Sequence, residues 1–337
     1  MTRLSRSRVR GPAICAVVVT YNRAALLERC LKALMRQSHR PAHVVVVDND
    51  SRDRTDDVLK RWAAHIDVVR LPENVGSATA FALGMQAAFT AGFDWVWVMD
   101  DDPLPERTAL ARLVRLARRT LPGQPAALSS VQWDPTLDKY NAGFLWRGLP
   151  HAVSRRWIED GRPYTVDLAP FCGFLVNRAL VTEVGYPRGD FFARFEDYEY
   201  CLRIRERGVP VFVDPKSRMV HPLGERNPKG HVVTRDAPWK AYYDMRNRVF
   251  TTVHIRGSLA EFFQELRFGL LQSLREVLLD RRRGVPNAWA RVSGTVDGLT
   301  GRMGKTVDPA GKRTRNGITG PGPWTEDPKV HGFGGRG

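Results

Sequence analysis

The chain has 337 residues, 43% of them hydrophobic, and it carries 52 Lys and Arg against 36 Asp and Glu, a formal net charge of +16. This length and hydrophobic content are enough for one large core or two modest ones, so a small scaffold that depends on cross-links is excluded. The positive charge predicts attraction to polyanions such as nucleic acid, anionic lipid or phosphate-bearing substrates, and it does not choose among them.

The cysteines and the first residues of the chain bear on its compartment. The four cysteines are isolated, with no C-x-x-C spacing, which argues against a disulfide scaffold and a zinc site and fits a reducing cytoplasm. The basic N-terminus precedes an apolar stretch that is too short for a secretory signal. No run approaches the roughly 20 apolar residues of a membrane span. We expect a cytoplasmic protein, with peripheral binding to the inner face of the cell membrane as an open alternative.

Strands and helices alternate over the first hundred residues. Residues 13–21 form a continuous apolar run typical of a strand buried on both faces, and residues 24–37 repeat apolar side chains at helical spacing. The same patterns predict strands at 42–48, 66–71 and 94–100, and helices at 54–65 and 77–91. Such alternation indicates an α/β fold, a parallel sheet with helices on both faces.

The pattern weakens after residue 126. A strand is predicted at 127–133, and residues 165–185 predict a strand, a break at small residues, a second strand and a short helix. A longer helix is predicted over 258–280. The end of the chain is rich in Gly and Pro and has little to bury, so we expect it to be largely disordered.

Polar residues stand at three of the predicted strand ends. The segments are "TYNR" (20–23) after the first strand, "DNDS" (48–51) after the second and "DDD" (100–102) after the fourth. Ligands of parallel sheets bind at the carboxyl ends of the strands, so the three segments should converge on one cleft. A purely structural turn is the alternative for "DNDS".

The triplet Asp100, Asp101 and Asp102 places three like charges at the end of a buried strand. An unneutralised cluster of carboxylates there would be costly, and a divalent cation would offset the repulsion. The position therefore favours a metal site over a structural turn.

Six segments occur in the order and rough spacing of the family 2 glycosyltransferases of the GT-A fold. They are "VVVTYNRAALLERCLKALMRQS", "VVVVDNDSRDRT", "ENVGSATAFALGM", "DWVWVMDDD", "FEDYEYCLRIRERG" and "VHP". Over residues 12–250 the sequence resembles most the bacterial galactofuranosyltransferases and rhamnosyltransferases of cell-wall glycan synthesis. The resemblance implies a mostly parallel, Rossmann-like sheet with helices on both faces, to which the chain adds a C-terminal helical extension.

The resemblance also implies a reaction, an inverting transfer of galactofuranose or rhamnose from a UDP- or dTDP-linked donor to a lipid-linked or cell-surface glycan. A cation, Mn²⁺ or Mg²⁺, neutralises a diphosphate leaving group, and the family match assigns Asp100, Asp102 and His221 as its ligands. Inversion needs a base opposite the leaving group. The match assigns that role to Asp197, with Glu196 beside it near the acceptor; acidic residues that only complement a helix N-terminus are the alternative.

The donor and the acceptor should meet residues at the strand ends and at one later segment. Carboxylates and amides suit a pyrimidine and a ribose, and a glycine at a helix N-terminus permits a phosphate to approach. The donor-binding residues expected on these grounds are Thr20, Tyr21, Arg23, Asp48, Asn49, Asn74, Gly76, Asp100 and Asp101. On the acceptor side the resemblance points to Gly173, Phe174 and Glu196, and a buried strand with a bulge is an equal alternative for the first two. Arg246 and Arg248 could also contact the diphosphate or the acceptor.

Two rival functions remain at this point. A nucleotidyltransferase would normally show a Gly-rich, basic loop after the first strand, and "VTYNRAALLERC" lacks one. A catalytically silent module that binds a glycan or a partner enzyme would keep the fold alone, and the full set of acidic and His positions argues against it. No G-x-G-x-x-G fingerprint supports a nicotinamide enzyme, and no motif supports nucleic-acid binding. The oligomeric state stays open.

The helix predicted at 258–280 carries an apolar stripe, and the residues after it hold eleven Lys and Arg against four Asp and Glu. The stripe consists of Phe262, Leu266, Leu270, Leu271, Leu274 and Leu278. It can pack on the α/β domain or lie on an anionic membrane that holds a polyprenyl-diphosphate-linked acceptor, and the sequence leaves both open. The expected division is a basic, flexible N-terminus (1–11), a GT-A catalytic domain (12–230), a C-terminal helical segment (231–283) and a basic, largely disordered tail (284–337).

Overall fold

Strand β1 (Ile14–Thr20) lies inside the sheet, and all seven of its residues are buried. Successive side chains of a strand point to opposite faces. Ala16 and Val18 accordingly pack in one hydrophobic cluster, and Val17 and Val19 pack in another on the opposite face.

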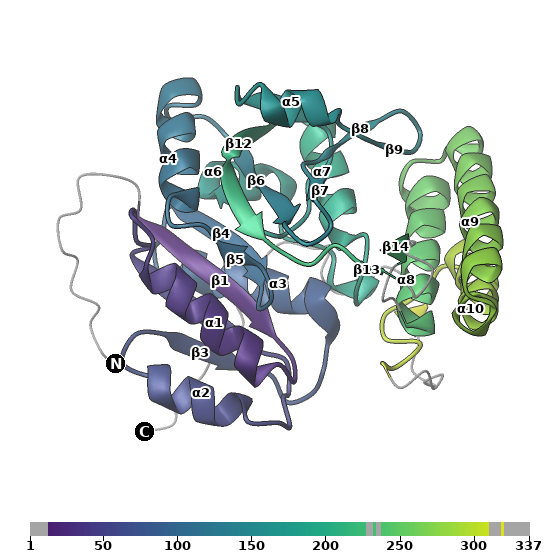
Figure 1. Ribbon diagram of the computed structural model, residues 1–337, viewed down its shortest axis with the longest axis horizontal. Coiled ribbons are helices and arrows are strands. Elements are labelled where there is room, and N and C mark those ends of the chain that lie inside the picture. The colour runs from purple at the N-terminus through teal and green to yellow at the C-terminus, as the bar shows by residue number, and fades with distance from the viewer. Residues whose placement is uncertain (1–12, 227–231, 234–236, 310–317, 320–337) are drawn as a thin grey trace.

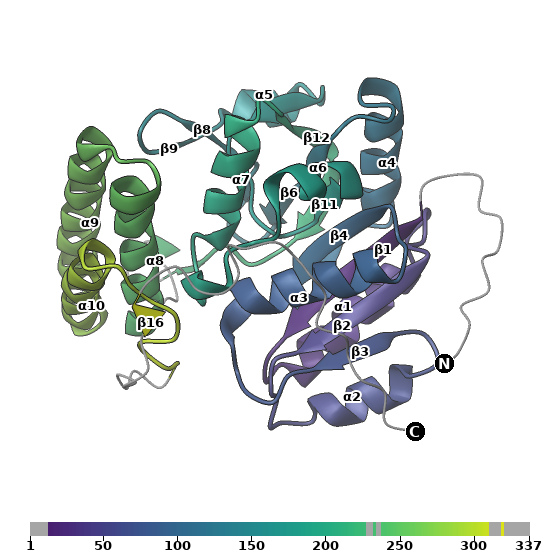
Figure 2. The ribbon, with the colours of Figure 1, turned by 180° about the vertical axis from the view of Figure 1, so that it is seen from behind.

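The computed structural model describes residues 13–226, 232–233, 237–309 and 318–319, and Figures 1 and 2 show it from opposite sides.

The first four long strands run parallel. β1 pairs with β2 (His43–Asp48) and β4 (Trp95–Asp100), and β2 pairs with β3 (Asp67–Arg70). The register sets Thr20 beside Asp48 and Val19 beside Asp100. The carboxyl ends of β1, β2 and β4 therefore meet at one edge of the sheet, as the sequence predicts.

The other half of the sheet is mixed, and the strand order is β10-β12-β6-β11-β4-β1-β2-β3. β11 (Phe174–Asn177) runs antiparallel between β4 and β6 (Ala127–Asp134), whereas β12 (Val211–Val220) is parallel to β6. The short strand β5 (Leu104–Pro105) pairs with the last residues of β12. This pairing brings the chain after Val220 beside the chain after Asp100. The remaining strands up to residue 233 are β7 (Lys139–Asn141), β8 (Phe144–Trp146), β9 (Pro150–Ala152), β10 (Tyr164–Val166), β13 (Glu225–Arg226) and β14 (Val232–Val233).

Helices cover both faces of the sheet (Figures 1 and 2). On one face lie α1 (Ala24–Met35), α2 (Thr55–Trp62) and α4 (Ala109–Thr120), and on the other lie α3 (Gly76–Thr90), α6 (Arg178–Val184) and α7 (Glu196–Glu206). The short helix α5 (Arg155–Glu159) joins β9 to β10, and the 3₁₀ turn η1 (Gly189–Phe191) lies between α6 and α7. The predicted α/β class, with helices on both faces and a helical extension after the sheet, is confirmed.

The C-terminal extension is a helical unit beside the sheet domain. It consists of α8 (Pro238–Phe250), the π-helical turn η2 (Thr251–Ile255), α9 (Leu259–Leu279) and α10 (Arg281–Leu299), followed by β15 (Arg302–Met303) and β16 (Ile318–Thr319). The expectation of disorder was therefore wrong for the first part of segment 284–337, whose expected boundary falls inside α10. The expected flexible N-terminus, residues 1–11, and residues 320–337 lie outside the described part of the chain.

Glycines that suggest disorder in the sequence are packing positions in α10. A Cβ added to Gly294 would lie 2.4 Å from the carbonyl oxygen of Tyr242, and one added to Gly298 would lie 2.6 Å from that of Arg246. Only glycine lets α10 approach the α8 backbone this closely. Within the described residues, no helix combines the length and the apolar character needed to cross a membrane.

Candidate functional site

The ends of β1 and β4 are joined through Asp101. Its carboxylate accepts a hydrogen bond from the Thr20 hydroxyl at 2.6 Å and one from Arg23 at 3.2 Å. Arg23 also donates to Asp102 at 3.0 Å. Burial raises the pKa of Asp101 to about 6, although Arg23 and Thr20 stabilise its charged form. Asp101 thus has a local structural role, which is compatible with the expected donor contact and does not test it.

Asp100 and Asp102 have opposite electrostatic surroundings. Burial, followed by the charges of Asp102 and Asp101, raises the pKa of Asp100 well above its usual range. Burial also acts to raise the pKa of Asp102, but His221 and Arg23 together outweigh it, so that pKa is lowered. His221 Nε2 lies 3.4 Å from Asp102 Oδ1, because the β5–β12 pairing brings their two segments together.

The same residues can be tested as ligands of a cation. Asp102 and His221 adjoin each other, and the buried Nδ1 of His221 has no hydrogen-bond partner in the described residues. The described ranges contain no group of three or more His, Cys, Asp or Glu side chains placed to hold a metal ion by themselves. A Mg²⁺-type site typically takes one or two protein carboxylates and completes its shell with substrate phosphates and water. The residues fit such a substrate-completed site.

The loops after β2 and β3 are braced by two asparagines. Asn49 Nδ2 donates to Asn74 Oδ1 at 3.0 Å, and Asn49 Oδ1 accepts from the backbone N–H of Val75 at 2.9 Å. Asp48 is buried and accepts from the N–H of Ser51 at 3.0 Å. These contacts fix the loops at the edge of the sheet where a donor nucleotide is expected. Tyr21 is partly exposed at the same edge.

Gly76 owes its identity to protein packing. Its φ is +87°, and an added Cβ would lie 2.0 Å from the carbonyl oxygen of Phe192. Its N–H already donates to Asn74 Oδ1 at 2.9 Å. The start of α3 therefore packs on the loop before α7, and the predicted approach of a phosphate to Gly76 stays a prediction.

Lys305, from the far end of the chain, reaches the same loop. Its Nζ donates to the carbonyl oxygen of Asn74 at 3.0 Å and lies 5.9 Å from the centre of the Phe192 ring. Sequence reasoning missed this cation because it belongs to the segment expected to be disordered. The C-terminal segment thus contributes a charged side chain at the edge of the expected donor site.

Glu196 and Asp197 open α7 with side chains in different surroundings. Glu196 is 7% exposed and accepts from Ser77 at 2.5 Å, and its second oxygen is buried without a partner in the described residues. Burial first, and then the Glu196 charge, raise the pKa of Asp197 to about 7. The Glu196 charge also acts to raise the pKa of Asp100. The two acidic clusters, some 95 residues apart in sequence, are therefore close enough to interact electrostatically.

The loop that leads into α7 is strained and is held by α8. Phe192, Arg194 and Phe195 all have positive φ, between 62° and 69°, which is unfavourable for side chains of this size. Asn247 Nδ2 lies 2.6–3.1 Å from three carbonyl oxygens of residues 191–194. The helical unit therefore supports the position of the acidic pair.

Arg246 and Arg248 are structural, and their expected contact with diphosphate or acceptor was wrong. Arg246 is 0% exposed and donates to the carbonyl oxygens of Phe191 and Gly304 at 2.7 and 2.6 Å. Arg248 pairs with Asp244 and with the buried Glu265. Both guanidinium groups already have hydrogen-bond or ion-pair partners inside the protein, and a single sequence does not reveal such partners.

The expected acceptor residues Gly173 and Phe174 lie in the core. Phe174 is 0% exposed, and its ring packs 5.4 Å from Phe171 and 6.5 Å from Tyr200, centre to centre. Its side chain has no surface to offer an acceptor, so for Phe174 that expectation is corrected in favour of the buried-strand alternative. Gly173, with φ of +82°, packs against Met219 and Ser130.

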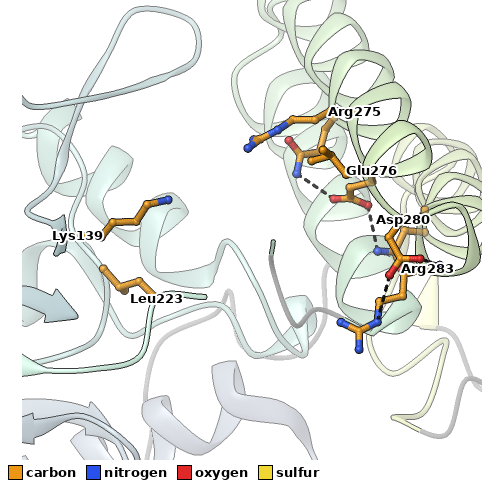
Figure 3. Close-up of a pocket in the computed structure, with 10 residues that line it drawn as sticks. Lys139, Leu223, Arg275, Glu276, Asp280 and Arg283 are labelled. Carbon is orange, nitrogen blue, oxygen red and sulfur yellow. Dashed lines mark hydrogen bonds and ion pairs between the residues drawn. The ribbon is translucent and has the colours of Figure 1, made fainter. Parts of the chain in front are cut away.

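A cavity of about 130 Å³ lies away from these residues, between the sheet domain and the helical unit. Figure 3 shows Lys139 and Leu223 on one side of it and Arg275, Glu276, Asp280 and Arg283 on the other. Its two carboxylates are engaged locally: Glu276 pairs with Arg291, and Asp280 caps α10. Leu223 follows His221 by two residues in the chain, but no residue of the candidate site lines the cavity.

Comparison with known proteins gives one family and consistent relatives. A family model described as "Glycosyl transferase family 2" matches residues 15–144. The chain is 30% identical over 295 residues to galactofuranosyltransferase GlfT1 of Mycolicibacterium smegmatis, covering 80% of this chain and 96% of the relative. It is 25% identical over 301 residues to dTDP-rhamnosyl transferase RfbF of Shigella flexneri, covering 86% and 97%.

A solved structure matches over most of its length as well. This is the mannosyltransferase PcManGT from Pyrobaculum calidifontis, in complex with GDP-Man and Mn²⁺, with a TM-score of 0.53 at 18% identity. The match covers 88% of this chain and 90% of that one. At this identity the likeness concerns the fold, and it extends beyond the sheet domain.

Proposed function

The chain belongs to the family 2 glycosyltransferases, and from that premise we propose that it is an inverting, metal-dependent enzyme of glycan synthesis. It moves galactofuranose or rhamnose from a UDP- or dTDP-linked donor to a lipid-linked glycan, with a polyprenyl diphosphate as the proposed anchor. The observation that carries the mechanism is the proximity of two acidic clusters, Asp100–Asp102 and Glu196–Asp197: Glu196 accepts from Ser77 at the start of α3, and its charge acts to raise the pKa of Asp100. The two proposed sugars are those named for the relatives, a galactofuranosyltransferase and a dTDP-rhamnosyl transferase.

Donor binding is assigned to the first cluster and the loops around it. Asp102, which is kept ionised by His221 and Arg23, supplies a carboxylate next to an imidazole. With Asp100, these residues are the proposed ligands of Mn²⁺ or Mg²⁺. The bound cation would neutralise the charge that develops on the departing diphosphate. Thr20, Arg23 and the asparagine-braced loops shape the nucleotide side of the cleft.

Acceptor activation is assigned to the second cluster. A base must remove the proton of the acceptor hydroxyl as that oxygen attacks the anomeric carbon and the bond to the diphosphate breaks. A general base works best when its pKa lies near the working pH, and the pKa of Asp197 is about 7. Glu196, held by Ser77, is the residue proposed to orient the acceptor.

A donor screen tests this proposal. The purified chain should hydrolyse or transfer from one of UDP-galactofuranose and dTDP-rhamnose in the presence of Mn²⁺ or Mg²⁺, and chelation with EDTA should stop turnover. GDP-mannose and UDP-glucose are matched control donors. Turnover of only a control donor would overturn the choice of sugar, and metal-independent turnover would overturn the cation's role.

A further inference from the structure

Exposed apolar side chains gather on two helices of the C-terminal unit. Twelve large hydrophobic residues are exposed in the described part of the chain, and eleven of them belong to α9 and α10. These are Leu259, Phe263, Leu270, Leu271, Leu274 and Leu278 on α9, and Val285, Trp289, Val292, Val296 and Leu299 on α10. Single exposed apolar residues are ordinary, but a concentration of this kind marks an interaction surface. We call these eleven residues the hairpin surface.

The hairpin surface is the outer side of the helical unit. On α10 its members recur at intervals of four, three, four and three residues, so they share one side of the helix. The opposite side, with Gly284, Gly294 and Gly298, is buried. Figures 1 and 2, taken from opposite sides, both show α9 and α10 at the edge farthest from the sheet, with α8 between them and the sheet.

The charges on the two helices divide by sign. Each of the five carboxylates within residues 259–299 has a partner inside the protein: Glu261 pairs with Arg256, Glu265 with Arg248, Glu276 with Arg291, Asp280 with backbone N–H groups of α10, and Asp297 with Tyr242. Five arginines of the same segment, Arg267, Arg275, Arg281, Arg282 and Arg283, are exposed, and Arg283 also pairs with Asp280. The two helices therefore present apolar and cationic groups outward.

We propose that the hairpin surface docks on an anionic lipid bilayer. Apolar residues on a helix face enter the boundary between headgroups and acyl chains, and neighbouring arginines attract anionic headgroups. Pairing with a second copy of the chain through the same surface would be isologous, so the arginines would face a surface of the same composition, whose carboxylates already have partners within their own copy. The charge pattern therefore favours lipid over self-association.

This surface extends the proposed function, since a bilayer would hold a lipid-linked acceptor, but binding to vesicles requires neither donor nor acceptor. A failure of vesicle binding would therefore leave the proposed transfer reaction untouched, and a failure of transfer would leave the proposed docking surface untouched. Residues of α9 and α10 also line the cavity that Leu223 borders, two residues beyond His221 (Figure 3).

Vesicle sedimentation of the full chain tests the proposal, using phosphatidylcholine vesicles with and without phosphatidylglycerol. The double variant Leu270→Ser with Leu274→Ser should bind anionic vesicles about tenfold more weakly than the unmodified chain. Arg281→Gln with Arg282→Gln should weaken binding by about 30-fold at low salt, because each arginine at an anionic surface contributes about fivefold. Both changes fall on exposed positions and should leave the helical circular dichroism unchanged.

Two matched variants control for surface changes elsewhere. Trp157→Ser removes the one large apolar residue that is exposed outside the hairpin surface in the described residues. Arg118→Gln with Arg119→Gln removes two exposed charges from α4. Both should bind vesicles as the unmodified chain does. Equal binding by all variants would overturn the proposal. So would a dimer in light scattering that the Leu270 and Leu274 changes convert to a monomer, because a second copy would then cover the surface.

Discussion

Replacing Asp197 with Asn should slow sugar transfer by about 10²–10⁴-fold while donor binding stays near normal, because the loss of a general base affects only the attack of the acceptor. In the unmodified chain, Asp197 Oδ1 accepts a hydrogen bond from the backbone N–H of Tyr198 at 2.9 Å. Asn has the same shape as Asp, and its side-chain oxygen can accept that hydrogen bond. It cannot take a proton. Steady-state transfer rates together with calorimetric affinity for the nucleotide measure the two effects separately.

The same residue sets an expected pH profile. Because burial and Glu196 raise the pKa of Asp197 to about 7, transfer should rise with pH through about 7 and level off above it, and the Asn variant should lack this rise. The stability of the fold should change with pH in the opposite direction to the transfer rate. A carboxyl whose pKa is raised by folding binds its proton more tightly in the folded state, so stability falls as pH rises towards that value. Above it, Asp197→Asn should be at least as stable as the unmodified chain.

Glu196→Gln is the matched control for the base. It keeps the ability to accept from Ser77, so its effect on transfer should be milder if Glu196 only orients the acceptor. An inactive Glu196→Gln beside a fully active Asp197→Asn would show that the two roles are exchanged. Normal transfer by both variants would remove the base from this segment altogether.

Asp102→Ala should lower the metal-dependent affinity for the nucleotide by at least about 100-fold, since changes to outer-shell residues alone typically cost 10–100-fold. His221 and Arg23 lower the pKa of Asp102 and so favour its ionised form. The change to Ala therefore removes a negatively charged ligand from the proposed cation site. Calorimetry with UDP and with dTDP, each with Mn²⁺ and with EDTA, measures the effect without any turnover.

Two further variants serve as a control and as a test of a second proposed ligand. Asp57→Ala removes an exposed carboxylate from α2 and should leave the affinity unchanged. His221→Ala should weaken the metal dependence with the fold intact. If Asp102→Ala binds nucleotide in Mn²⁺ as tightly as the unmodified chain, the acidic triplet does not have the assigned role.

The elements of the first hundred residues were predictable because their signals are local, whereas α4 and β12 of the same domain were not predicted. The apolar run that becomes β1 is buried on both faces, and the periodic residues Leu27, Leu31 and Leu34 of α1 face the core. The convergence of the strand ends followed from parallel topology alone. The proximity of His221 and Asp102 came from the family resemblance, and the β5–β12 pairing supplies its structural cause.

The sequence-based predictions failed for residues whose partners lie far away in the sequence. Arg246 looks like a free cation in "WKAYYDMRNRVF", yet its partners include carbonyl groups at positions 191 and 304. The glycines of α10 suggest disorder until the α8 backbone against them is known. Lys305 and Asn247 carry no local signal at all, because each acts on a loop more than 50 residues away. Such roles depend on tertiary packing and not on local pattern.

The stereochemistry of the product tests the central claim most directly, once the donor screen has named the donor. NMR of the newly formed glycosidic bond gives the anomeric configuration of the transferred sugar. A single displacement assisted by Asp197 on the face opposite the diphosphate predicts a configuration inverted from that of the donor. A retained configuration would contradict this account, since it would require a second displacement or attack from the side of the leaving group.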